Sequence, residues 1–172
     1  MIKAEVIILA GGLATRLGGL TKKKPKSLIK INNKPFIERQ LDFLKKQGFK
    51  KVIISIGHHG NQIKNYLDKN YKKKIKILYV KDKPKLLGTG GAIINSLKYL
   101  TNYFYVVYGD SYLRIDLKKM KKTYLKKKPK ILMGIYKNNN KLDKSNISIN
   151  KKGYIYYNKN NPKKDMKYID YG

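Results

Sequence analysis

The chain has 172 residues, no cysteine and a formal net charge of +31 at pH 7. This length suits one domain with a buried core, and the lack of cysteine excludes disulfides and thiolate metal sites. No apolar run approaches the roughly 18 residues of a transmembrane helix, and the first residues lack the apolar segment of a signal peptide. We therefore expect a cytoplasmic protein with no membrane partner.

Lysine accounts for almost all of the positive charge. Among the 41 basic residues, arginine occurs only at positions 16, 39 and 114, and the lysines are spread along the whole chain. Lysine, asparagine, isoleucine and tyrosine share A/T-rich codons, so a biased genome can produce this composition. Proteins that read nucleic acids usually gather arginine and stacking aromatic residues on one face. We expect no specific nucleic-acid partner, although the charge alone gives loose polyanion binding in dilute salt.

Predicted strands and helices alternate over the first 125 residues. Apolar runs predict strands at 6–9, 52–56, 75–80 and 104–108, and apolar residues at helical spacing predict helices at 35–47, 61–68, 90–99 and 116–125. Such alternation predicts an α/β fold, a Rossmann-like and mainly parallel sheet with helices on both faces. Four later β-like pieces, at 131–136, 146–149, 154–157 and 168–171, predict a mixed or antiparallel extension of that sheet.

A glycine pair follows the first strand, in the sequence Leu9-Ala10-Gly11-Gly12, and Thr15, Arg16 and Lys26 come after it. Glycines let backbone N–H groups approach phosphate oxygens, while an arginine fork and a lysine point charge can neutralise a triphosphate. The spacing fits neither the P-loop nor the dinucleotide fingerprint. Taken alone, the loop is equally well explained as a plain glycine turn with solvated basic residues.

Two further motifs fall at the same predicted edge of the sheet. Gly88-Thr89-Gly90-Gly91 leads from the third strand into its helix, where small residues let a flat base lie against the backbone; Thr89 as a helix cap is the plainer alternative. Gly109-Asp110 follows the fourth strand, and a carboxylate there can hold Mg²⁺ together with substrate phosphates; a turn-capping aspartate is the alternative. Ligands of open α/β sheets bind at the carboxyl ends of strands, so the convergence favours a nucleotide site.

These motifs resemble, in type and order, the signature of the sugar-1-phosphate nucleotidyltransferases. The resemblance rests on Leu9-Ala10-Gly11-Gly12-x-x-Thr15-Arg16-Leu17, Pro25-Lys26-x-Leu28, Leu87-Gly88-Thr89-Gly90-Gly91-Ala92 and Gly109-Asp110. The final segment, 168–172, is similar to the sugar-pocket strand of the D-glycero-D-manno-heptose 1-phosphate guanylyltransferase branch. UDP- and dTDP-sugar pyrophosphorylases and phosphocholine cytidylyltransferases share the earlier motifs and remain alternatives.

The resemblance implies a reaction in which an NTP and a sugar 1-phosphate give an NDP-sugar and pyrophosphate, with Mg²⁺ as cofactor. It implies GTP as the nucleotide and a role in polysaccharide synthesis. By the same resemblance Arg16 stabilises the leaving pyrophosphate, Lys26 the α-phosphate, and Asp110 holds the metal. The implied nucleotide-binding residues are Leu9, Ala10, Gly11, Gly12, Thr15, Gly88 and Thr89, and the implied sugar-binding residues are Gly109, Asn158 and Asp170.

The resemblance also implies a domain plan. We expect a single nucleotidyltransferase domain over 1–172, with a nucleotide-binding part at 1–110 and the start of a sugar-binding part at 111–172. Family members are longer and carry a second metal-binding aspartate downstream, so we expect a C-terminally truncated chain. Asn158 stands where the family tends to have an acidic residue. Homo-oligomers are also expected.

Two other classes of function stay open at this point. A non-catalytic nucleotide-binding subunit would keep the fold and lose turnover, although Arg16, Lys26 and Asp110 argue against it. A basic nucleic-acid-binding module would make Asp110 incidental, and a carboxylate beside a polyanion groove is unfavourable there. The base, the sugar and the oligomeric state are not fixed by spacing alone.

Overall fold

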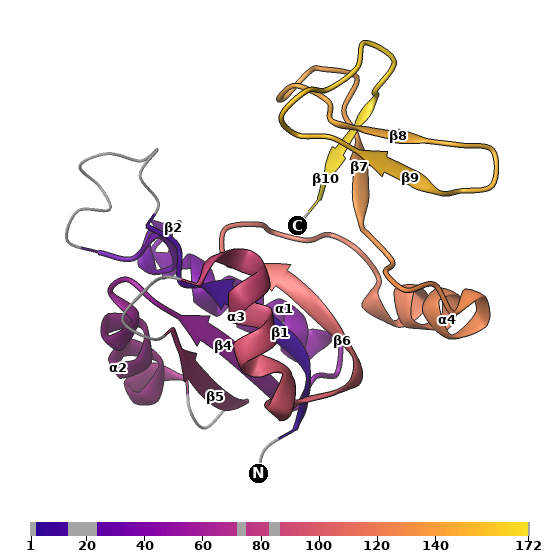
Figure 1. Cartoon of the computed structure of the whole chain (residues 1–172). Coiled ribbons are helices and arrows are strands. Elements are labelled where there is room, and N and C mark those ends of the chain that lie inside the picture. Colours follow the sequence, from indigo (N-terminus) through magenta and orange to yellow (C-terminus); the bar gives the residue numbers. More distant parts are fainter. Residues whose placement is uncertain (1–2, 14–23, 72–74, 83–86, 172) are drawn as a thin grey trace. The chain divides into compact units, whose positions relative to one another are not determined.

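The computed structural model describes residues 3–13, 24–71, 75–82 and 87–171 (Figure 1). The chain divides into two compact units, Met1–Tyr112 and Leu113–Gly172. Among the described residues, no helix combines the length and the apolar character needed to cross a membrane.

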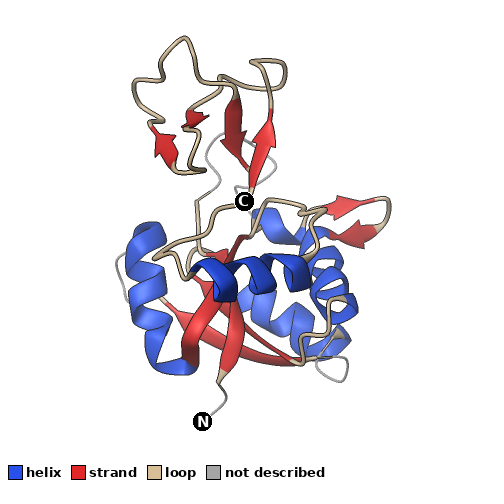
Figure 2. Cartoon of the chain, turned by 90° about the vertical axis from the view of Figure 1, so that its right-hand side faces the viewer, coloured by secondary structure: helices blue, strands red, loops and turns tan. Residues whose placement is uncertain are grey.

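The first unit is built on a parallel sheet of four strands. Its strands, in spatial order, are β5 (Lys76–Lys81), β4 (Lys51–Ile56), β1 (Ala4–Ala10) and β6 (Leu100–Tyr108). Its helices are α1 (Phe36–Lys46), α2 (Gly60–Asn70), α3 (Gly88–Ser96) and the short 3₁₀ turns η2 (Lys26–Leu28) and η3 (Leu97–Tyr99). Figures 1 and 2 show α3 on one face of the sheet and α1 and α2 on the other. The predicted Rossmann-like architecture is confirmed.

Continuous apolar runs explain the central strands. In β1, Val6, Ile7 and Ile8 are fully buried, as are Ile53 and Ile54 of β4. Strands covered by helices on both faces need apolar residues at every position rather than at alternate ones. This is the sequence pattern from which both strands were predicted.

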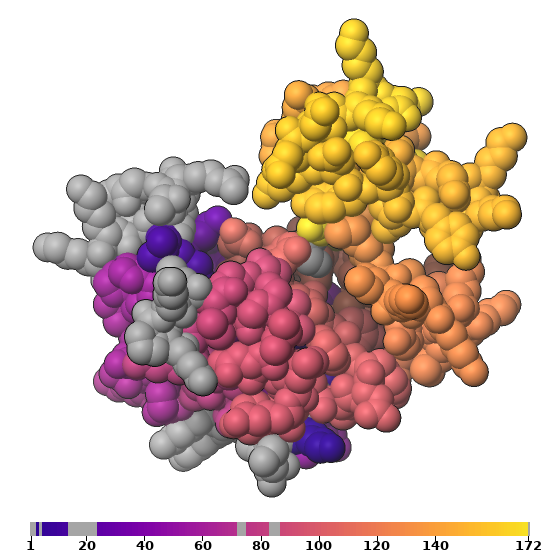
Figure 3. Space-filling model, viewed as in Figure 1, coloured from indigo at the N-terminus to yellow at the C-terminus, as the bar shows by residue number. Residues whose placement is uncertain are grey.

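Helix α3 lies at the surface of the first unit (Figure 3). Ile94 of α3, at 69% exposure, and Leu97 of η3, at 48%, are exposed, whereas Ala92 and Ser96 of α3 are buried. The helix begins at Gly88, two residues before the predicted start, and its last turn is the 3₁₀ segment η3.

A short hairpin precedes α1 and was not predicted. It pairs β2 (Lys30–Ile31) with β3 (Lys34–Pro35). Asn32 and Asn33, between them, have φ angles of 47° and 62°. Asparagine tolerates this left-handed region, and two such residues form the tight turn that joins hairpin strands. The Asn-Asn pair is therefore the sequence feature from which this turn could have been predicted.

The second unit combines one helix with a small antiparallel sheet. The helix is α4 (Leu117–Lys127), and the Asp116 side chain caps it by accepting from Lys119 N at 3.0 Å. The sheet has the order β7 (Ile135–Lys137), β10 (Tyr168–Asp170), β8 (Ile147–Ile149), β9 (Ile155–Tyr157).

The antiparallel prediction is confirmed for these strands, but the prediction that they extend the first sheet is wrong. All pairings of β7 to β10 given by the described residues are with one another. The strand expected at 131–136 is also reduced to Ile135–Lys137, and Ile131 is 84% exposed. Strands of three residues offer few backbone groups and so form only short ladders, which here join β7 to β10, β10 to β8 and β8 to β9.

Candidate functional site

The carboxyl ends of β1 and β6 lie side by side. Leu9 is in register with Tyr108, and Gly109 N donates to Leu9 O at 2.9 Å. A Cβ at Gly109 would lie 2.5 Å from Leu9 O, so only glycine fits this close approach. Asp110 is therefore fixed next to the end of β1, where the Gly11-Gly12 loop begins.

Lys26 and Asp110 form an ion pair, with 2.8 Å between Nζ and Oδ2. Both side chains are partly exposed, at 40% and 48%. Lys26 is carried by η2, and its neighbours Ser27 and Leu28 are buried and anchor the turn. Two predicted catalytic residues that are 84 positions apart in the chain are thus brought into contact.

The backbone around Gly11 is closely packed. A Cβ there would lie 3.2 Å from both Asp82 Oδ2 and Gly57 N, so a larger residue would press on the ends of β4 and β5. Around Gly12, by contrast, a Cβ would meet nothing within 4 Å, and the residue is exposed. Gly11 is needed for packing, while Gly12 leaves the loop backbone accessible.

Asp82 was missed by sequence reasoning. It follows β5 directly, is 9% exposed, and its Oδ2 accepts from Leu87 N at 3.5 Å while lying close to Gly11. This carboxylate therefore lies close to the glycine loop after β1 and is hydrogen-bonded to the residue that precedes α3. Its role could have been suspected from the sequence, because Asp82 is an acidic residue among lysines and comes immediately after a predicted strand of the same sheet.

The second glycine motif forms the start of α3. Gly88 has a φ of +66° and, like Thr89, is exposed. Leu87 is the residue before the helix and Thr89 lies inside its first turn, so Thr89 as the helix cap is wrong. A Cβ at Gly91 would lie 2.8 Å from Leu87 Cβ, so this position needs a glycine. Unpaired N–H groups at a helix start favour anions and polar ligand atoms.

The described structure does not test the placement of four predicted site residues at this edge. Thr15 and Arg16 lie outside the described residues. Asn158 and Asp170 belong to the second unit: Asn158 accepts from Asn161 N at 2.9 Å through Oδ1, and Asp170 lies opposite Ile135 in the β10–β7 pair. Their assignment to a sugar site stays a prediction.

The donor set suits a metal that is held together with a substrate. No group of three or more His, Cys, Asp or Glu side chains gathers within the described part of the chain. Mg²⁺ commonly takes one or two carboxylates and completes its shell with substrate phosphates and water. The half-exposed carboxylate of Asp110 fits that pattern, with Lys26 available to move to a phosphate.

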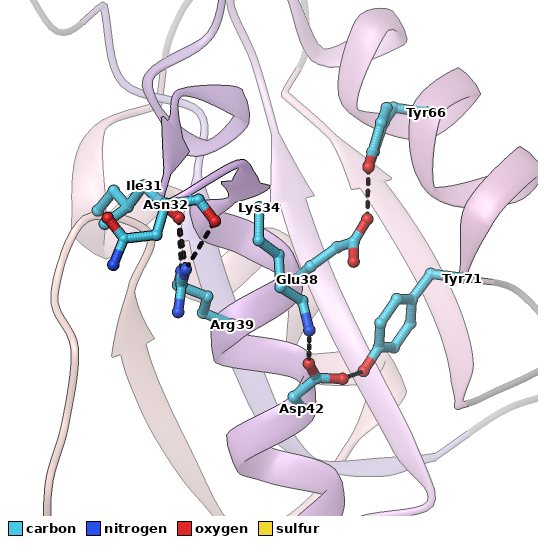
Figure 4. Close-up of polar contacts among 8 residues, drawn as sticks. All are labelled: Ile31, Asn32, Lys34, Glu38, Arg39, Asp42, Tyr66 and Tyr71. Atoms are coloured by element: carbon cyan, nitrogen blue, oxygen red, sulfur yellow. Dashed lines mark hydrogen bonds and ion pairs between the residues drawn. The ribbon is translucent and has the colours of Figure 1, made fainter.

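A polar network on α1 holds the β2–β3 hairpin (Figure 4). Arg39 donates through Nε to Ile31 O at 3.2 Å and through Nη2 to Asn32 O at 3.4 Å. On the next turn of α1, Asp42 forms an ion pair with Lys34. These contacts hold both strands of the β2–β3 hairpin on α1, and the hairpin follows η2 directly.

The same helix is tied to α2 by two tyrosines. The Tyr66 hydroxyl donates to Glu38, and the Tyr71 hydroxyl donates to Asp42 (Figure 4). Burial, with the hydrogen bond and the negative charge of Glu38, raises the pKa of Tyr66 to about 12. Burial and Asp42 raise the pKa of Tyr71 in the same way. Both phenols therefore stay neutral donors at neutral pH.

This fold is that of an α/β protein with a parallel sheet, and at the carboxyl edge of that sheet a charged pair lies beside a glycine loop. Residues 5–157 match the Nucleotidyl transferase family, and the chain belongs to that family. The family and fold expected from the sequence motifs are confirmed.

Two curated relatives are D-glycero-alpha-D-manno-heptose 1-phosphate guanylyltransferases. The protein of Campylobacter jejuni is 45% identical over 117 residues, which is 68% of this chain and 52% of the relative. That of Aneurinibacillus thermoaerophilus is 39% identical over 118 residues, 67% of this chain and 50% of the relative. The chain thus spans about half the length of these relatives.

Among solved structures, HddC from Yersinia pseudotuberculosis is similar over most of the chain. The TM-score is 0.80 at 28% identity, and the match covers 98% of this chain and 74% of HddC. A second structure of HddC, in complex with GMP-PN, also gives a TM-score of 0.80.

Proposed function

We propose that the chain acts as a sugar-1-phosphate nucleotidyltransferase that uses GTP and a heptose 1-phosphate, with Mg²⁺, to form a GDP-heptose and pyrophosphate. The observation that carries the proposal is the Lys26–Asp110 ion pair at the carboxyl edge of the sheet. GTP and heptose are supported by the names of two curated relatives and by the GMP-PN complex of HddC. Polysaccharide synthesis in the cytoplasm is the setting in which such a product would be made.

The proposed reaction is an in-line displacement at the α-phosphorus. An oxygen of the sugar phosphate forms the new bond as the bond to pyrophosphate breaks, so no covalent enzyme intermediate is needed. Phosphoryl and nucleotidyl transfer depend mainly on positioning and charge neutralisation. Lys26 would bind the α-phosphate and the incoming phosphate, and Arg16 the leaving pyrophosphate.

Asp110 would hold Mg²⁺, which supplies positive charge to the phosphate oxygens when bound. In the described structure Lys26 neutralises this carboxylate. On nucleotide binding the ammonium group would transfer to phosphate, leaving the carboxylate free to serve the metal. Leu9, Ala10, Gly11, Gly12, Gly88 and Thr89 would enclose the nucleotide between the two glycine motifs.

The test measures nucleotide binding and pyrophosphate release on the same sample. Each NTP is titrated with Mg²⁺ by calorimetry, and pyrophosphate release is then followed with a panel of sugar 1-phosphates. Tightest binding of GTP and release with a heptose 1-phosphate would support the proposal. Binding without release for any pair would support a non-catalytic nucleotide-binding subunit, and failure of both would contradict a nucleotide site.

A further inference from the structure

Gln40 is a buried polar side chain at the centre of α1. It is 3% exposed, and its Nε2 donates to Tyr108 O and to Ser111 O, both at 2.8 Å. These two carbonyls stand on either side of Gly109-Asp110, 68 and 71 positions away in the chain. One side-chain amide thus reaches across the unit to the turn that carries the proposed metal ligand.

Backbone hydrogen bonds and the Lys26–Asp110 ion pair also hold this turn. Ser111 N donates to Tyr108 O at 3.2 Å and closes the four-residue turn, while Gly109 N donates to Leu9 O at 2.9 Å. The parallel ladder of the sheet ends at Leu9 and Tyr108, so Asp110 lies beyond it. The two hydrogen bonds from Gln40 join the first and last residues of the turn to α1.

Burying the Gln40 side-chain amide costs free energy because its oxygen has no partner in the described part of the chain, and its two N–H hydrogen bonds offset that cost. Gln40 Oε1 is buried without a hydrogen-bond partner among the described residues. A buried acceptor left unpaired is unfavourable, and an apolar side chain would fill the same space without that cost. The two N–H bonds to the turn are therefore what the amide provides here.

Both halves of the Lys26–Asp110 pair depend on the same helix. Arg39 and Asp42 hold the hairpin that follows Lys26, and Phe36 N donates to Ile29 O at 3.0 Å just beyond η2. Gln40 holds the turn that contains Asp110. A shift of α1 or loss of its polar contacts would move one charged group relative to the other.

We propose that Gln40 is a positioning residue for Asp110: it fixes the Tyr108–Ser111 turn so that the carboxylate can bind a metal–nucleotide complex. The part of this inference that concerns the metal rests on the proposed function. The part that concerns the turn does not, because it is a statement about hydrogen bonds within the first unit.

Two substitutions separate hydrogen bonding from shape. Gln40→Glu keeps the shape but removes the amide donors: an ionised carboxylate donates to neither carbonyl oxygen and is repelled by both, and a protonated one donates to only one of them. Gln40→Met keeps the length with no donor and no charge. Ile37→Val, at another fully buried position of α1, is the matched control because it loosens packing without touching the turn.

The first measurement is amide hydrogen exchange in the absence of ligand. We expect exchange at Gly109 and Ser111 to rise about tenfold in both Gln40 variants, as expected for loss of a hydrogen bond of about 1.4 kcal/mol. Exchange in β1 and β4 should stay as in the wild type, and Ile37→Val should leave the turn unchanged. Wild-type exchange at Gly109 and Ser111 in both Gln40 variants would overturn the proposal.

The second measurement is the Mg²⁺ concentration that half-saturates the enhancement of GTP binding. We expect it to rise about tenfold in Gln40→Met, while GTP affinity without metal is unchanged. An unchanged metal requirement together with faster exchange would overturn the link to the metal. If the wild type shows no metal-dependent GTP binding, the proposed function fails, and the exchange experiment still decides whether Gln40 holds the turn. If Gln40→Glu does not fold, Gln40→Met decides both measurements.

Discussion

The two units of the chain are stabilised in different ways. The first has parallel strands of six to nine residues; five of the six residues of β4 are buried, as are Val6, Ile7 and Ile8 at the centre of β1. The second has strands of three residues, and all three residues of β9 are exposed. Its buried apolar residues among those described are Leu113, Leu117, Ile147 and Met166. The proposed nucleotide site lies on the unit with the larger core.

Side-chain hydrogen bonds replace apolar packing in part of the second unit. Asn138, at 2% exposure, donates to Asp143 O at 2.5 Å and to Ser145 Oγ at 3.0 Å, and it accepts from Leu142 N at 2.9 Å. Asn140 Oδ1 accepts from Ser145 N at 2.7 Å. A buried side chain that satisfies several backbone groups can fix a loop that has no core of its own. The proposed site therefore lies at the edge of an apolar sheet, whereas the 138–145 loop of the second unit is held by polar side chains.

The largest effect is expected from truncating the larger core. Ile53→Ala should lower the free energy of unfolding of the first unit by about 2–5 kcal/mol, because it removes a fully buried side chain of the central sheet. Urea denaturation followed by hydrogen exchange of β1 and β6 measures it. Ile147→Ala, at a fully buried position of the second unit, is the matched change and should leave the first unit's exchange unaltered. Simultaneous unfolding of both units in both variants would show that they are not independent.

The next effect concerns binding rather than folding. Asp110→Asn should weaken Mg²⁺-dependent GTP binding roughly 100-fold, because a carboxylate ligand is lost. Its stability should stay close to that of the wild type, since the side chain is 48% exposed. Asp143→Asn, an exposed aspartate of the second unit, is the control, and calorimetry measures both. Equal weakening by the two substitutions would mean that binding follows overall charge.

A smaller and local effect is expected from Asn138→Ala. The loss of three hydrogen bonds from a buried position should destabilise the 138–145 loop by about 1–3 kcal/mol. The readout is faster amide exchange at Leu142, with GTP binding by the first unit unchanged. Unchanged exchange at Leu142 would show that the loop does not depend on Asn138.

The smallest effect is a pH dependence that arises in the first unit. Tyr66 and Tyr71 have raised pKa values in the folded chain, whereas unfolded tyrosine ionises near pH 10. The hydrogen bonds to Glu38 and Asp42 therefore stabilise the fold fully below about pH 10, and this contribution is lost as the pH rises toward 12. The stability difference between wild type and Tyr71→Phe, roughly 1 kcal/mol at pH 8, should shrink between pH 10 and 12.

Urea denaturation at each pH measures this difference. Tyr154→Phe removes the same hydroxyl from a side chain that is 72% exposed, and it should show no such trend. A constant difference between wild type and Tyr71→Phe across the alkaline range would exclude a stabilising phenol–carboxylate pair.

Much of the first unit could be predicted because its signals are local. Apolar runs specify β1, β4 and β5, and helical spacing specifies α1 and α2, since both patterns reflect which faces are buried. The closeness of Lys26 and Asp110 could also be expected from the sequence, because parallel strands place their carboxyl ends at one edge of the sheet.

Other features depend on contacts that no local pattern records. Gln40 bonds to residues 68 and 71 positions away, and Asp82 lies close to Gly11, so neither role is visible in the local sequence. The β2–β3 hairpin has strands of two residues, so its only local signal is Asn32-Asn33. The pairing of the second sheet was predicted wrongly because the sequence of a three-residue strand does not indicate which strand it pairs with.

The central claim is that a nucleotide is held by particular groups at one sheet edge and not by the chain's net charge. Amide hydrogen exchange with and without GTP and Mg²⁺ tests it most directly. The claim predicts slower exchange at Gly11–Gly12, Lys26–Leu28, Gly88–Thr89 and Gly109–Ser111, with no change along the lysine-rich helix α4. Equal protection of α4, or no protection at the four edge segments, would contradict it.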